Sequence, residues 1–214
     1  GGKGGAAGSG GRVEVDHAGA LITLGVQAHG IYAQSVGGGG GTAGSAEGGF
    51  AGVDSIGLNF AFGQAGGRGG NGGAVTVKSS GTIETQGHRS IGIAAQSVGG
   101  GGGAAGDRSG LAFFGSVGGF GSAGAVSVMH EGSIVTEGER AHGIFAQSAG
   151  GLTGTVGSGE AASSYEGRGG TVEVTLRGAG IDARGALSDG ILAQSLGEAG
   201  RGAITDSGLD AKDI

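Results

Sequence analysis

The chain has 214 residues, of which 61 are glycine, and it contains no proline, cysteine or tryptophan. Without cysteine it has no disulfide, thiolate metal site or thiol nucleophile. Its net charge of −6 is spread without the basic stripe that nucleic-acid binding needs. Its apolar runs fall short of the about 20 residues of a membrane-spanning helix, so we expect no direct membrane insertion. Since it begins with Gly1 and shows no signal peptide, we expect it to be part of a longer protein.

The first predicted elements are three short segments, Val13–Val15, Leu21–Thr23 and Gly30–Ser35. Each places apolar residues at alternate positions, which is typical of a strand with one buried face. Helix is a poor competitor, because glycine at this density would cost a helix about 1 kcal/mol per residue relative to alanine. The sequence therefore predicts three β-strands per unit, separated by glycine and small polar residues.

The same unit returns three more times along the chain. Its last segment, Gly-Ile-x-Ala-Gln-Ser, begins at Gly30, Gly92, Gly143 and Gly190. We place the four repeat cores at about residues 10–36, 72–98, 123–149 and 169–196, in a single array spanning residues 1–214 with 197–214 as a tail or cap. The fourth core carries one extra residue around Gly178–Gly180, which shifts its register.

Variable glycine-rich inserts separate the cores. Two of them open with glycine runs, Gly37–Gly41 and Gly99–Gly103, that resemble phosphate loops but lack the following Lys-Ser/Thr. Variation confined to one place in the unit is typical of loops. The sequence leaves open whether the inserts form additional coils instead.

Stacking of the units predicts an all-β fold, a parallel β-helix (β-solenoid) built from four imperfect glycine-rich repeats. Each unit cannot bury its apolar face alone, and stacking pairs every strand with its equivalent about 4.8 Å away. A flexible glycine-rich linker is the alternative that the composition allows. The four aligned β-segments argue against it.

The final residues of the repeated motif are expected to form ladders along the stack. The ladder positions are Gln34, Gln96, Gln147 and Gln194, with Ser35, Ser97, Ser148 and Ser195. Stacked side-chain amides satisfy one another's polar groups. If the inserts form coils of their own, the glutamines are separated instead, and the sequence leaves both arrangements open.

Another position of the motif decides whether the array has an adhesive face. It is occupied by Tyr32, Phe145 and Leu192, which point opposite to the core-facing isoleucines. These residues form an outward contact stripe if exposed, and belong to the core if an insert covers them. We favour the covered arrangement, because a long exposed apolar stripe invites aggregation.

Catalytic, cofactor-binding and metal-binding residues are not found. His29 shares a repeat position with His142, and His17 shares one with His130. Two histidines a full unit apart do not supply the three or four converging ligands of a metal site. The acidic residues fall at scattered offsets, without the paired carboxylates of a glycan-cleaving enzyme. We expect no enzyme activity, no metal and no cofactor, with a β-helical polysaccharide-processing module as the alternative.

The repeats resemble the passenger repeats of large glycine-rich bacterial autotransporters of type V secretion. The similarity rests on Gly-Ile-x-Ala-Gln-Ser-Val with a glycine run, at Gly30–Gly41 and Gly92–Gly103, and on Gly-Gly-Ala-Val-Thr-Val at Gly72–Val77. It implies a surface-exposed β-helix of a Gram-negative bacterium, carried through the outer membrane by a C-terminal β-barrel. It further implies a rigid stalk or adhesin whose partners are molecules of a host or neighbouring cell surface.

Overall fold

The computed structural model describes residues 7–39, 69–100, 121–151 and 167–197, with the backbone of short strands at 45–46, 60–63, 112–115 and 201–206. Within these ranges the chain forms strands and no helix, so the all-β prediction is confirmed. It follows that no described helix is long and apolar enough to cross a membrane. Of the predicted tail or cap, only Gly197 and the strand at 201–206 belong to the described residues.

The larger parallel sheet joins strands from all four predicted cores. Its order is β1 (Val13–Ala18), β6 (Val75–Thr85), β9 (Val126–Thr136), β11 (Thr171–Ala183) and β13 (Arg201–Asp206), and β2 (Leu21–Thr23) pairs with the end of β6. Every pairing is parallel. Val13 lies opposite Val75, which lies opposite Val126. Equivalent residues of successive segments therefore form columns across the sheet.

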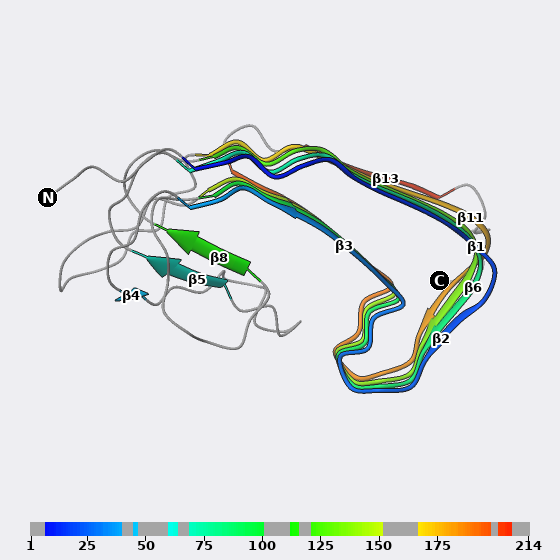
Figure 1. The fold of residues 1–214 in the computed structure, drawn as a ribbon. Helices are drawn as coiled ribbons and strands as arrows, with labels where there is room; N and C mark the ends of the chain where they lie inside the picture. Colours follow the sequence, from blue (N-terminus) through cyan, green and yellow to red (C-terminus); the bar gives the residue numbers. More distant parts are fainter. Residues whose placement is uncertain are drawn as a thin grey trace, which may run out of the picture.

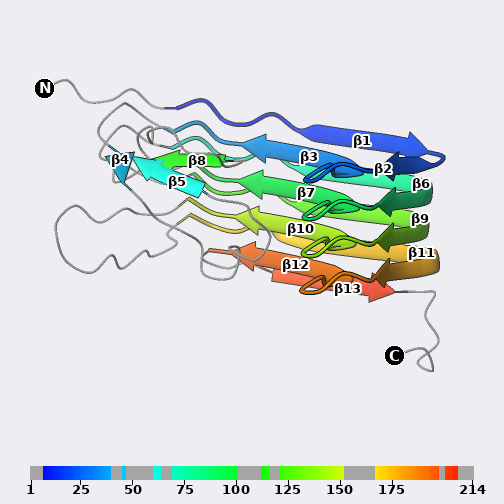
Figure 2. The same cartoon turned by 90° about the horizontal axis from the view of Figure 1, so that it is seen from below.

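The second parallel sheet consists of the repeated Ile-x-Ala-Gln-Ser motifs. Its order is β12 (Ile191–Leu196), β10 (Ile144–Ala149), β7 (Ile93–Val98) and β3 (Ile31–Val36). These strands pair in register, and Figure 2 shows them one after another along the stack. Since β3 pairs directly with β7 and β7 with β10, no additional coil lies between them.

The first two inserts contribute short strands to a separate sheet. β5 (Phe60–Gly63) pairs in parallel with β8 (Ala112–Gly115), and β4 (Ser45–Ala46) pairs antiparallel with β5. Figure 1 places this small sheet beside the second parallel sheet, on the side away from the large sheet. The remaining residues of the inserts lie outside the described residues, and the loop prediction for them stays a prediction.

The hydrophobic core lies between the two parallel sheets. Viewed along the stack in Figure 1, the large sheet, the turn and the second sheet follow one another around it. Burial alternates along most of β6 and β9, as expected for strands with one face on a core. The larger buried core residues are Ile31, Val75, Val77, Ile83, Ile93, Val126, Val128, Ile134, Ile144, Val172, Val174 and Leu176. Most of them are the alternating apolar positions from which the sequence predicts the strands.

Glycines form the corner halfway along the strands of the large sheet. Gly81 and Gly132 have φ of +104° and +141°, where side chains are disfavoured. A Cβ on Gly132 would also overlap the carbonyl oxygen of Gly81. In the fourth segment, β11 shifts register against β9 between Arg177 and Gly180. The extra residue predicted there is accommodated as a β-bulge.

Candidate functional site

The four predicted glutamines lie side by side in the second parallel sheet. The Nε2 of Gln34 donates to Oε1 of Gln96 at 2.5 Å, and Gln96 donates to Gln147 at 2.6 Å. Gln147 completes the series by donating to Gln194 at 2.9 Å. The two buried glutamines, Gln96 and Gln147, each donate to one neighbour and accept from the other. These bonds satisfy polar groups whose burial would otherwise be unfavourable. Of the two arrangements left open by the sequence, the structure has the adjacent one.

The four predicted serines bond to backbone rather than to one another. Ser35 Oγ donates to Gly11 O at 2.7 Å and accepts from Gly73 N, of the next segment, at 2.9 Å. Ser97 and Ser148 repeat this pattern, and Ser195 makes its donating half with Gly170 O. The four serines lie opposite one another in the second sheet, at the predicted ladder positions, and tie that sheet to the residues just before the strands of the large sheet.

The predicted outward stripe is not a continuous exposed surface. Tyr32 is 37% exposed, but Phe145 is only 1% exposed and Ala94, between them in the column, 2%. Leu192 is half-buried. An outward contact stripe through Phe145 is therefore wrong, and the covered arrangement is the one observed. The physical reason is that both faces of β7 and β10 are removed from solvent, not only the face toward the core.

The first two glycines of each run have their backbone amides bonded to other segments of the chain. Gly37 N donates to Val98 O and Gly38 N donates to Gly8 O, both at 2.9 Å. In the second run, Gly99 N and Gly100 N likewise donate to carbonyls, at 2.8 Å each. Since a phosphate cradle needs free N–H groups, the described part of these runs serves to join segments of the stack.

Four of the five histidines lie in two columns, His17 with His130 and His29 with His142, and His88 lies in neither. No group of three or more metal-ligating side chains occurs among the described residues. His142 is 1% exposed, and its Nδ1 accepts from Asp189 N at 3.0 Å; His29 accepts from Ile91 N in the same way. An Nδ1 that accepts from a backbone N–H carries no proton, which favours the neutral ring. For His142, the Asp189 carboxylate 3.2 Å from Nδ1 favours the protonated ring instead. Burial lowers the pKa of both, although for His142 the nearby Asp189 carboxylate partly opposes that shift.

His130 is a polar residue on the core face of β9. It is 1% exposed, and its Nδ1 lies 2.8 Å from Ser79 Oγ in the neighbouring strand. Its Nε2 is buried and has no hydrogen-bond partner among the described residues. Burial lowers the pKa of His130, opposed in part by a backbone hydrogen bond with Ser133. Leu176 fills the equivalent position in the next strand, which indicates that packing rather than chemistry governs this column.

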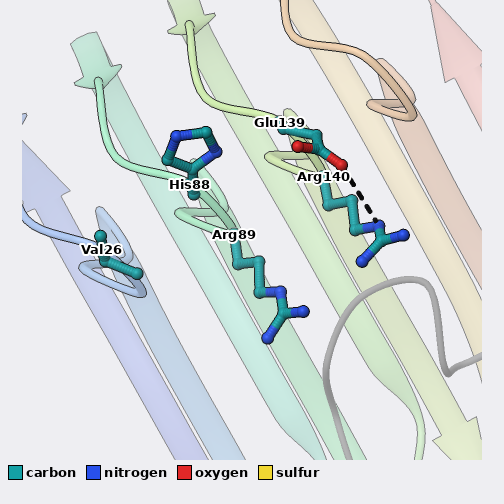
Figure 3. Close-up of a pocket in the computed structure, with 5 residues that line it drawn as sticks. All are labelled: Val26, His88, Arg89, Glu139 and Arg140. Carbon is teal, nitrogen blue, oxygen red and sulfur yellow. Dashed lines mark ion pairs between the residues drawn. The ribbon is translucent and has the colours of Figure 1, made fainter.

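A surface hollow of about 240 Å³ lies at the stacked turns that lead into the second sheet. It is lined by Val26, His88, Arg89, Glu139 and Arg140 (Figure 3). Arg89 and Arg140 belong to the inner segments of the array (residues 69–100 and 121–151). The end segments (residues 7–39 and 167–197) place Gln27 and Leu187 at the same step of the motif. We did not predict this site from the sequence. The signal available was a repeat position, three residues before the motif glycine, that carries arginine twice.

No family model matches the chain, and neither a curated protein nor a solved structure matches it. Function must therefore be inferred from the residues and their geometry.

Proposed function

We propose that the chain is a β-solenoid segment of a surface-displayed bacterial protein of the autotransporter-passenger type, and that it acts as a rigid spacer or stalk. The observation that carries this proposal is the parallel pairing that runs across all four segments, in register except at the bulge in β11. Repeated backbone hydrogen bonds along one axis give stiffness without a ligand or metal.

Three side-chain features support a mechanical role. The glutamine series is hydrogen-bonded from Gln34 to Gln194, and the serines bond the two sheets to each other. Most of the core columns are formed by valine and isoleucine, β-branched residues that suit stacked strands. The burial of Phe145 argues against adhesion through the Tyr32 column, so a spacer accounts for the chain better than an adhesin acting through that stripe.

The solenoid can be tested by a distance between its two end segments. Glu14 and Glu173 are exposed and lie in one column through Thr76 and Ser127. Because the chain has no cysteine, Glu14→Cys and Glu173→Cys can carry nitroxide labels without further changes. The two labelled positions are three strand spacings apart, so we expect a narrow distribution of distances around a backbone separation of about 14 Å. Dipolar broadening in continuous-wave EPR measures it. A flexible linker would give a broad distribution centred near about 70 Å.

Surface display needs a separate experiment. Cells that carry the native gene are treated with external protease, and the chain is followed by antibody. We expect cleavage or labelling of the chain on intact cells. Access only after lysis would contradict the display proposal while leaving the solenoid untouched, so the two parts of the proposal fail separately.

A further inference from the structure

The hollow at the stacked turns has two arginines as its main charged lining. Arg89 N donates to Glu139 O at 2.8 Å, and Arg140 N donates to Ala186 O at 2.9 Å. These bonds hold successive turns in register, with φ of 57° at Arg89 and 56° at Arg140. Figure 3 shows the two side chains extending in the same direction from neighbouring turns. Two guanidinium groups are thus held one strand spacing, about 4.8 Å, apart at their backbone attachment.

The backbone at these positions does not explain the choice of arginine. A positive φ of this size is left-handed, where glycine and asparagine are the favoured residues. The chain uses glycine at 61 other positions, yet both inner segments carry arginine here. Gln27 and Leu187 adopt the same φ in the end segments, so this turn accepts several side chains and does not itself select arginine.

The positive charge of the pair is poorly neutralised. Arg89 makes no ion pair with an acidic group of the described residues. Arg140 has only Glu139, whose Oε1 lies 3.8 Å from Nε, too far for a hydrogen bond. That Nε is itself buried without a hydrogen-bond partner among the described residues. Two like charges on neighbouring turns repel each other, and an anion bound between them would offset the repulsion.

We infer that Arg89 and Arg140 together bind one tetrahedral oxyanion, sulfate or phosphate, either free or as an ester group of a larger molecule. Each guanidinium presents a planar fork of donors. A planar carboxylate is satisfied by one such fork, whereas a tetrahedral anion has oxygens in several planes and accepts from both. The two arginines outnumber the single carboxylate of the lining, Glu139, so the hollow favours an anion. This site is independent of the spacer role.

The end segments make the site specific to the middle of the stack. Gln27 and Leu187 occupy the same backbone conformation, with φ of 57° at both. Neither carries a charge, and Val26 closes the hollow on the side of the first segment. The Arg89–Arg140 step therefore joins two arginines, while the steps on either side of it do not.

The test is a titration of the ¹⁵N-labelled full chain with sodium sulfate and with phosphate, at constant ionic strength maintained with sodium chloride. We expect saturable shifts of the Nε–H and backbone N–H signals of both arginines, and much smaller shifts with acetate. Arg89→Gln and Arg140→Gln should each weaken binding by at least about tenfold, because each removes charged hydrogen bonds. Gln27 shows that glutamine fits this turn. Exposed Arg177→Gln, in the large sheet, is the matched control and should bind normally.

Several results would overturn the inference. One is a linear change of the chemical shifts with sulfate or phosphate that equals the change with chloride. The others are saturation by acetate at the same concentration, and an affinity that is unchanged in both Arg89→Gln and Arg140→Gln. The titration of the unsubstituted chain decides the question even if a variant fails to fold. Methyl phosphate and a monosulfated sugar distinguish the two sources. If either ester binds as tightly as the free ion, the site accepts an ester group of a larger molecule. If neither ester binds, the ligand is the free anion.

Discussion

The inner and end segments share one sequence motif but differ in what surrounds it. All six residues of β7 and of β10 are buried, whereas all six of β12 are half-buried and β3 alternates between buried and less buried positions. β7 and β10 each pair with strands on both sides, while β3 and β12 each pair on one side within their sheet. The same motif therefore acquires different burial from its place in the stack, which makes each end segment a control for its inner equivalent.

The largest expected difference in stability is between alanine variants of Phe145 and Tyr32, which occupy one column. Phe145→Ala should lower the free energy of unfolding by about 3–5 kcal/mol, because it leaves a cavity at a position 1% exposed. Tyr32→Ala should cost less than about 1 kcal/mol, since Tyr32 is 37% exposed. Urea unfolding followed by circular dichroism measures both. Equal losses would show that the end segment is as tightly enclosed as the inner one.

A second pair tests the close approach of stacked turns. A Cβ on Gly87 would overlap the carbonyl oxygen of Gly25, whereas a Cβ on Gly25 would lie 3.5 Å from Ala28 Cβ, an ordinary contact. Gly87→Ala should therefore destabilise by about 3 kcal/mol through forced separation of the turns. Gly25→Ala should stay within about 0.5 kcal/mol of the unsubstituted chain. The midpoints of thermal unfolding give the comparison, and similar midpoints for the two variants would contradict it.

The glutamine series gives an intermediate effect. Gln147 is fully buried and bonded to Gln96 and Gln194, so Gln147→Leu leaves a donor and an acceptor unpaired. We expect a loss of about 1–3 kcal/mol in the free energy of unfolding. Gln194→Leu leaves only one group unpaired, the Nε2 donor of Gln147, instead of two, and should cost less. If Gln194→Leu is the more damaging change, the end strand carries more of the stability than its burial implies.

The smallest effect concerns pH. The folded-state pKa of His130 lies below the usual 6.5, so between those two values the unfolded chain binds more protons than the folded chain. Stability is therefore unaffected by this group above about pH 6.5 and falls as the pH falls toward the folded pKa. His130→Leu introduces leucine, the residue found at position 176 of the same column. Between about pH 7 and 5.5, the urea concentration at the unfolding midpoint should change less with pH in this variant than in the unsubstituted chain. An unchanged slope in His130→Leu would contradict this assignment.

Local pattern was enough to predict several elements. Alternation in Val75–Val77 and Ile83–Thr85 identifies both halves of β6, and the glycine between them marks its corner. The extra residue near Gly178–Gly180 predicts the bulge in β11. These features are local because a strand's period of two and the positive φ of a corner are properties of a few consecutive residues.

The sequence by itself thus determined the strands, their core face and which residues share a repeat position. Only the tertiary structure decided that Gln34 meets Gln96 across 62 residues and Gln147 meets Gln194 across 47, although the inserts differ in length. It also decided that Phe145 is covered, that the serines bond to backbone and that Arg89 lies beside Arg140. The physical reason is that the alternation of residues along a strand fixes which face each side chain is on. The residues that contact it and bury it come from segments far away in the chain.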